Sequence, residues 1–229
     1  MVLKYYFDLM SQPCRAVYIF LKVANIPFEP CTVALRKGEH RTEEFKQKLN
    51  KFQLVPFIHD GDFKLSESVA IFRYLTREYP VKDNWYPKDS KQQARIDEYL
   101  EYQHLNIRGH CTLYFRQKWL EPTITGKQPD PKKLKILEGN VVNALDKFQE
   151  FFLADTPFIN SQTVSFADIL AACEIEQPRM AGFEPRDGRP RLKEWIERVR
   201  TECNPYYDEA HVVLYKRVEK AKQSAQARL

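Results

Sequence analysis

The chain has 229 residues, of which 43% are hydrophobic and 29% charged, and its formal net charge is +5. One large domain or two modest ones fit this length, and the apolar share is sufficient for a packed core, which excludes a disordered or fibrous chain. Acidic and basic residues are interspersed and no uncharged stretch reaches the ~18 residues that a membrane helix needs, so we expect neither a nucleic-acid nor a membrane partner.

Over residues 1–79 the spacing of apolar residues switches repeatedly between that of a strand and that of a helix, which predicts alternating strands and helices. Polar residues dominate 36–45, where we expect a loop with a short helix, and Asp60-Gly61-Asp62 is a hairpin turn signal. The order β-α-β followed by β-β-α predicts an α/β domain with a mixed four-stranded sheet. Strands are expected at 2–7, 28–35, 55–58 and 63–65, and helices at 11–23 and 67–79.

The composition changes after Tyr79. Residues 80–88 contain Pro80 and Pro87 and have no hydrophobic period, so we interpret them as a linker. Residues 89–229 have a helical period that is broken at prolines, which predicts an all-α helical domain and hence a two-domain α+β protein. Helices are expected at 90–119, 132–152, 166–177, 191–203 and 206–222.

One helix start in the second domain is explicit. Ser165 stands at the N-cap position of a predicted helix. Asp168 follows three residues later, where its carboxylate can accept a hydrogen bond from the backbone N–H of Ser165. Val164 and Ile169 are spaced as a hydrophobic staple across this start. Such a cap is worth about 1 kcal/mol, and we assign it a structural role.

The first strand and the first helix meet in the segment Asp8-Leu-Met-Ser11-Gln-Pro-Cys14. A helix N-terminus leaves N–H groups unpaired and carries partial positive charge, so it stabilises an anion. Ser11 is either a helix cap or a hydrogen-bond donor to such an anion, and Cys14 is either a core residue or a nucleophile. The residues alone leave both questions open.

Five cysteines, at positions 14, 31, 111, 173 and 203, form no CxxC motif and no spacing typical of metal ligands. We expect them to be free thiols in a reducing compartment, with no metal bound. The N-terminal segment carries Lys4 and Asp8 within its apolar run and lacks the layout of a signal peptide, which favours a cytoplasmic protein.

A small thioredoxin-like α/β domain followed by an all-helical domain resembles the cytosolic glutathione transferases, over essentially the whole chain. Three segments resemble the theta class specifically, namely Asp8 to Tyr18, Asp60 to Ile71 and Trp85 to Pro87. The resemblance implies an enzyme that conjugates the thiolate of glutathione to small hydrophobic electrophiles (halides, epoxides, activated alkenes) or reduces organic hydroperoxides. It also implies a homodimer that uses glutathione as co-substrate and no metal.

The resemblance assigns residues to glutathione. Val55 precedes a cis proline, Pro56, and its backbone pairs with the cysteinyl residue of glutathione. Glu67 pairs with the ammonium of the γ-glutamyl end, while Ser68 and free helix N–H groups hold its carboxylate, a combination suited to a zwitterion. His40 approaches the glycyl carboxylate.

The segment that would hold the glycyl end departs from the family pattern. Lys51 stands where proline is usual, one residue is inserted before Asn50, and Gln53 and Leu54 stand where basic side chains are common. Leu54 remains a predicted glutathione-binding residue, but the anchoring of the glycyl end is open.

Two residues are assigned to catalysis. Ser11 donates a hydrogen bond to the glutathione sulfur and stabilises the thiolate without acting as a base. Arg108 points into the cleft near the sulfur, where a cation stabilises a thiolate or an anionic leaving group. Cys14 is the rival nucleophile, but its position inside the helix after Pro13 favours packing in the core.

The electrophile pocket is expected from position alone, in residues that suit a core equally well. Relatives often place an acid beside the arginine to reach glutathione across a dimer interface, where this chain has Leu105 and Asn106. The end of the chain soon after Lys222 predicts a lid that is short or absent. The predicted electrophile-binding residues are Met10, Leu35, Cys111, Tyr114 and Phe115.

Two alternatives stay open. One is a non-catalytic binding module of the glutathione transferase type; such modules typically lose Ser11 or the Glu67-Ser68 pair, and this chain has both. The other is a thiol transferase that depends on Cys14.

Overall fold

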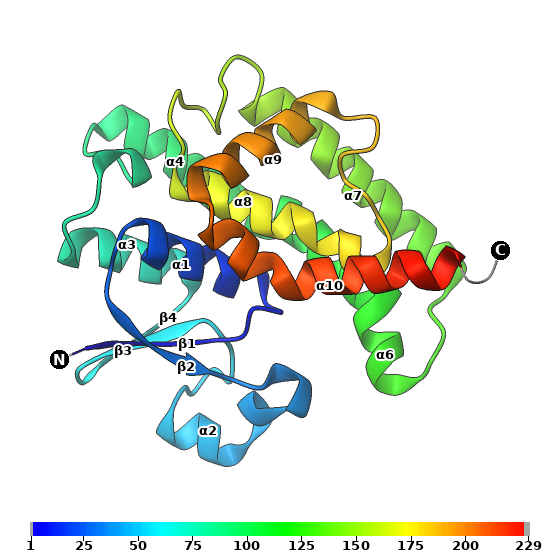
Figure 1. Ribbon diagram of the computed structural model, residues 1–229, viewed down its shortest axis with the longest axis horizontal. Helices are drawn as coiled ribbons and strands as arrows, with labels where there is room; N and C mark the ends of the chain where they lie inside the picture. The colour runs from blue at the N-terminus through cyan, green and yellow to red at the C-terminus, as the bar shows by residue number, and fades with distance from the viewer. Residues whose placement is uncertain (1, 227–229) are drawn as a thin grey trace.

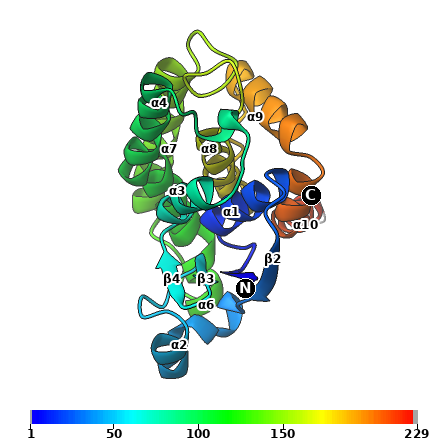
Figure 2. The same ribbon diagram turned by 90° about the vertical axis from the view of Figure 1, so that its left-hand side faces the viewer.

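The computed structural model describes residues 2–226. A four-stranded sheet with its own helices lies against a larger group of helices (Figure 1). In both views α1 and α3 cover the face of the sheet that looks toward the other helices, and α2 covers the opposite face (Figure 2). The elements of this part are β1 Leu3–Phe7, α1 Gln12–Val23, β2 Phe28–Thr32, α2 Glu43–Lys48, β3 Phe57–Asp60, β4 Phe63–Ser66 and α3 Ser68–Glu78.

The sheet has the strand order β2-β1-β3-β4. Strands β1 and β2 are parallel, whereas β3 runs antiparallel to both β1 and β4, so the predicted mixed sheet is confirmed. Strand β2 ends at Thr32, earlier than predicted, because a 3-10 turn at Leu35–Lys37 closes on Gly38, whose φ is +73°. Strand β3 begins at Phe57, since Pro56 has no N–H to give to a ladder.

Residues 90–226 are mainly helical, as predicted. The expected helix 90–119 is interrupted by two π-helical turns, His104–Arg108 and Arg116–Leu120. In the first of them the N–H of Arg108 donates to the carbonyl of Gln103 at 2.9 Å, five residues back. The helices are α4 Ser90–Tyr102, α5 Gly109–Phe115, α6 Glu121–Thr125, α7 Pro131–Phe152, α8 Phe166–Glu176, α9 Pro190–Cys203 and α10 Tyr206–Gln226.

Helix α8 is the centre of the molecule, and each of its residues is buried. The ring of Phe166 at its start stacks on Phe72 of α3 with 4.0 Å between centroids, and Phe20 of α1 meets Phe166 edge-on. Sheet helices and bundle helices therefore share one hydrophobic core. The division into domains 1–79 and 89–229 stays a prediction.

The start of α8 is held by the buried carboxylate of Asp168. It accepts hydrogen bonds from the N–H of Ser165 at 2.9 Å, the N–H of Ile159 at 2.8 Å and the indole of Trp195 in α9 at 2.9 Å. The hydroxyl of Ser165 donates to the same carboxylate. The predicted pairing of Ser165 and Asp168 thus forms, and it also joins α8 to α9.

Candidate functional site

The loop between β1 and α1 places Ser11 at the helix start. Asp8 fixes this loop, because its carboxylate accepts the N–H of Met10 at 2.9 Å and, from the next loop, the N–H of Leu35 at 3.1 Å. Ser11 has extended backbone and is the N-cap residue of α1, yet its side chain makes no capping bond to an N–H of Gln12–Val23. Ser11 is thus the N-cap residue of α1 by its backbone, and its hydroxyl gives α1 no side-chain capping bond.

The side chain of Ser11 lies close enough to the thiol of Cys14 to lower its pKa. Burial raises the pKa of Cys14 to about 12, and the bonds from Ser11 and the Asp8 backbone offset only part of that rise. A fully buried thiol with this pKa is protonated at neutral pH and is a poor nucleophile. The geometry therefore favours Cys14 as a core residue.

A cavity of about 110 Å³ lies where the sheet domain meets the helix that carries Arg108. Chain segments that are far apart in sequence supply its walls. Six predicted site residues line it, namely Leu54, Val55, Pro56, Glu67, Ser68 and Arg108. Sequence reasoning missed six others, namely Pro13, Ser66, Gln103, His104, Leu170 and Glu174.

The Leu54–Pro56 wall is shaped by Asn50, which is buried and was not predicted to matter. Its side-chain amide donates to the carbonyl of Leu54 at 2.9 Å, and its oxygen accepts from the N–H of Phe52 and the hydroxyl of Ser66. The Val55–Pro56 peptide bond is cis, as the resemblance implied. Val55 precedes β3 and takes no part in its ladder pairs with β1 and β4.

The opposite wall is the N-terminus of α3. Glu67 is its N-cap residue and has a φ of +73°, a left-handed conformation that side chains with a Cβ rarely adopt outside special sites. The Glu67 side chain is exposed, and it forms no capping bond within the described part of the helix. Ser68 is the first helical residue, so the unpaired N–H groups of α3 and a free carboxylate border the same cavity.

Arg108 reaches the cavity from the first π-turn, where it meets a buried carboxylate. Its Nη1 lies 2.5 Å from Oε1 of Glu174 in α8, whose side chain is fully buried. Burial raises the pKa of Glu174, and the charge of Arg108 opposes this rise. The predicted cation is thus present, but it is paired with an acid that sequence reasoning did not foresee.

Several predicted residues do not line the cavity. Ser11 lies two residues before Pro13, which does line it. His40 is half-buried in a 3-10 turn, its Nδ1 has no hydrogen-bond partner within residues 2–226, and burial lowers its pKa. Gln53 has a φ of +55° and donates to the carbonyl of Thr42 at 3.3 Å.

The five predicted electrophile residues fall into separate clusters. Cys111 and Tyr114 are buried in the main core, and Leu35 packs on the core between α2 and the sheet. Met10 and Phe115 pack together with residues of α10, among them Leu214. Helix α10 thus contributes to the apolar cluster that includes Met10, the residue directly before Ser11, and the predicted short or absent lid stays a prediction.

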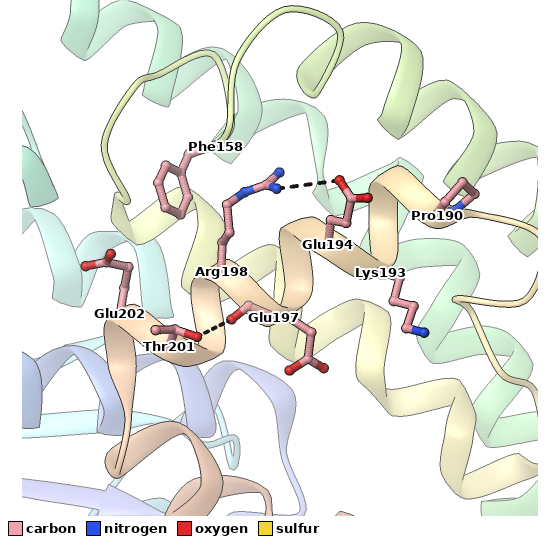
Figure 3. Close-up of a pocket in the computed structure, with 8 residues that line it drawn as sticks. All are labelled: Phe158, Pro190, Lys193, Glu194, Glu197, Arg198, Thr201 and Glu202. Carbon is pink, nitrogen blue, oxygen red and sulfur yellow. Dashed lines mark hydrogen bonds and ion pairs between the residues drawn. The ribbon is translucent and has the colours of Figure 1, made fainter.

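A second hollow, about 710 Å³ and wide open, follows the outer side of α9 (Figure 3). Among its charged side chains, Arg198 pairs with Glu194 at 3.9 Å and donates to the carbonyl of Pro157. Phe158 is its main apolar residue. We assign this hollow no function.

Within residues 2–226, no three His, Cys, Asp or Glu side chains come together in a way that could hold a metal ion. The helices described here include none that is long and apolar enough to cross a membrane.

Residues 1–77 match the family model of the glutathione S-transferase N-terminal domain, and residues 102–202 match that of the C-terminal domain. Glutathione S-transferase theta-1 of Bos taurus is 43% identical over 217 residues, which cover 94% of this chain and 90% of the relative. The theta-1 protein of Homo sapiens is 42% identical over the same share of both chains.

Solved structures of glutathione transferases are also similar to this chain. The apo form of human glutathione-S-transferase T1-1 superimposes with a TM-score of 0.91 at 41% identity, covering 95% of this chain and 91% of that one. Human glutathione transferase theta-2 in complex with glutathione and an unknown ligand gives a TM-score of 0.90 at 39% identity, with 97% and 91% covered.

Proposed function

The chain belongs to the glutathione S-transferase family, and on that premise we propose that the cavity lined by Leu54–Pro56, Glu67, Ser68 and Arg108 binds glutathione. The protein is a glutathione transferase similar to the theta class, with glutathione as its co-substrate. What supports the site most is the convergence of the 54–56 segment, the start of α3 and Arg108 on one cavity, which Pro13, two residues after Ser11, also lines.

The walls of the cavity match the ends of the tripeptide. The exposed carboxylate of Glu67 is available for the ammonium of the γ-glutamyl group, and Ser68 with the N–H groups of α3 for its carboxylate. The backbone of Val55, which β3 leaves unused, pairs with the cysteinyl residue. His40 and Leu54 lie toward the glycyl end.

Ser11 stabilises the thiolate. In the structure its side chain already lowers the pKa of the nearby Cys14 thiol, and an anionic sulfur is a strong hydrogen-bond acceptor. Lowering a thiol pKa of about 8.5 by about two units takes roughly 2.7 kcal/mol. One charge-assisted hydrogen bond supplies about 1.5–3 kcal/mol and a helix N-terminus up to about 2, so no general base is required.

The electrophiles are small and hydrophobic: halides, epoxides, activated alkenes or organic hydroperoxides. Met10 and Phe115 support this assignment, because they form an apolar cluster next to Ser11. In this proposal the electrophile does not contact Cys111 or Tyr114, which are buried in the main core. It does not contact Leu35 either, which packs between α2 and the sheet.

Retention on immobilised glutathione, followed by a turnover panel of these four electrophile classes, tests the function. Retention with turnover of at least one class is expected. Retention without turnover would instead support a non-catalytic binding module, and exchange of disulfides that requires Cys14 would support a thiol transferase.

We further propose a cytoplasmic homodimer. Two observations support this assignment. The side chain of Leu105 is 85% exposed on the first π-turn and that of Phe52 is 56% exposed near the cavity, so both offer apolar surface to a second copy. The five cysteines are free, which suits a reducing compartment. Sedimentation equilibrium should give twice the chain mass of 27.2 kDa, and a monomer would contradict the dimer.

A further inference from the structure

Glu174, whose carboxylate is fully buried, lines the proposed glutathione cavity. Each of its two carboxylate oxygens has a different partner. One oxygen pairs with Arg108, and the other accepts from the hydroxyl of Thr112 at 3.5 Å. Thr112 in turn accepts from the side-chain amide of Gln12 at 3.0 Å, and Gln12 directly follows Ser11. Glu174 therefore connects the start of α1 with the guanidinium of Arg108.

The charge of Glu174 depends on this pairing. A buried carboxylate is costly to keep ionised unless a cation and hydrogen bonds compensate it. Two cations face it, Arg108 and Arg15, but the guanidinium of Arg15 is bonded to the carbonyls of Leu9 and Cys173 and to Gln177. Arg108 is the cation in direct contact.

We propose that Glu174 is the positioning residue of Arg108: it holds the guanidinium at the cavity wall and offsets its charge. The inference rests on the proposed glutathione site and adds a residue that touches neither the sulfur nor the electrophile. Arg108 presents a tethered, partly neutralised cation to the cavity, and the thiolate competes with Glu174 for it.

The first consequence concerns the charge. Glu174→Gln removes the negative charge and leaves that of Arg108, so the pKa of the bound glutathione thiol falls by about half a unit. In an Arg108→Met background the buried carboxylate has lost its cation and takes up a proton. There Glu174→Gln has no charge to remove, and the thiol pKa does not change.

The second consequence concerns position. Glu174→Gln frees the guanidinium to move, so kcat falls by about tenfold, the value of one charge-assisted hydrogen bond. For this measurement the pH is set where the bound thiol is fully ionised, so that the altered thiol pKa does not enter. In the Arg108→Met background the same substitution leaves kcat unchanged.

The experiment titrates the ultraviolet absorbance of bound thiolate and measures kcat for wild type, both single variants and the double variant. Glu184→Gln is the control, since Glu184 also pairs with arginines, Arg179 and Arg186, but does not line the cavity. Glu174→Gln effects that vanish without Arg108 support the proposal. Equal effects in both backgrounds, or none in either, overturn it.

Thr112→Val replaces Glu174→Gln if the latter variant does not fold. It keeps the ion pair and the side-chain volume but removes the hydroxyl between Gln12 and Glu174. We expect kcat to fall about two- to threefold, and only when Arg108 is present. A wild-type protein without bound thiolate would contradict the proposed function instead, which separates that failure from failure of the role of Glu174.

Discussion

At the residue scale, the site residues that could be predicted from sequence are those whose role depends on their place in a local strand-turn-helix pattern. Ser11, Glu67 and Ser68 stand at helix starts, and a strand-turn-helix pattern shows where those starts are. Glu174 and Asn50 could not be found this way. Their roles depend on partners that only folding brings close. Glu174 in α8 pairs with Arg108 of the first π-turn, and Asn50 accepts a hydrogen bond from Ser66 in β4.

Cys14 provides the first residue-scale prediction. Cys14→Ala should change kcat/KM for glutathione conjugation less than twofold, because the thiol is buried and protonated. Steady-state kinetics with one alkyl halide and one epoxide measures this. A loss of activity, together with intact folding by circular dichroism, would favour the cysteine mechanism.

Glu67 provides the second. Glu67→Gln should raise KM for glutathione about tenfold with a smaller change in kcat, since one charge-assisted bond to the ligand ammonium is lost. Glu78→Gln, at the other end of α3 and also exposed, is the matched control. Equal KM values for the two variants would remove Glu67 from the binding site.

At the element scale, periodicity predicted nearly every helix and strand, and failed where hydrogen bonding departs from the regular pattern. The helix expected at 90–119 contains two π-turns, and the first of them carries Arg108. A π-turn inserts a residue without changing the apolar period enough to be seen in sequence. The hydrophobic pattern therefore could not predict on which side of the helix Arg108 lies, and hence that it reaches the cavity.

The α8 cap gives an element-scale prediction. Asp168→Ala should lower the free energy of unfolding by about 3 kcal/mol or more, because buried donors on Ile159, Ser165 and Trp195 lose their acceptor. Urea unfolding followed by tryptophan fluorescence measures it. A loss below about 1 kcal/mol, the worth of an isolated cap, would mean that the α8–α9 link contributes little.

Helix α10 gives a pH-dependent prediction. His211 is fully buried, and burial together with the nearby Arg15 lowers its pKa well below the usual value, although the Nδ1–H bond to the Tyr207 carbonyl and the charge of Asp208 oppose this. Arg179 adds to the lowering. The folded state thus binds its proton less readily than the unfolded chain.

The sign follows from linkage. The stability that neutral His211 contributes is present above the unfolded pKa of about 6.5 and is lost as pH falls below it, by at most about 1.4 kcal/mol per pH unit. His211→Asn keeps a donor near Nδ1 and should flatten the slope of unfolding free energy between pH 7 and pH 5. Parallel slopes for variant and wild type would contradict a neutral buried His211.

At the scale of the whole molecule, the two-part architecture and the family were predictable, but the cavity was not. It lies between the sheet domain and the helices, and its walls come from α1, the 54–56 segment, the start of α3, the first π-turn and α8. The stacked rings of Phe72 and Phe166 fix how these parts meet. Which electrophile enters depends on this packing and on α10 beside Met10, which no local pattern encodes.

The central claim is that this molecule binds glutathione beside Ser11 and stabilises its thiolate there. The most direct measurement is the pH titration of thiolate absorbance for glutathione bound to wild type and to Ser11→Ala. We expect the wild-type complex to titrate about two units below free glutathione, and Ser11→Ala to restore at least one of them. Identical titrations for both proteins, or a wild-type value equal to that of free glutathione, would contradict the account.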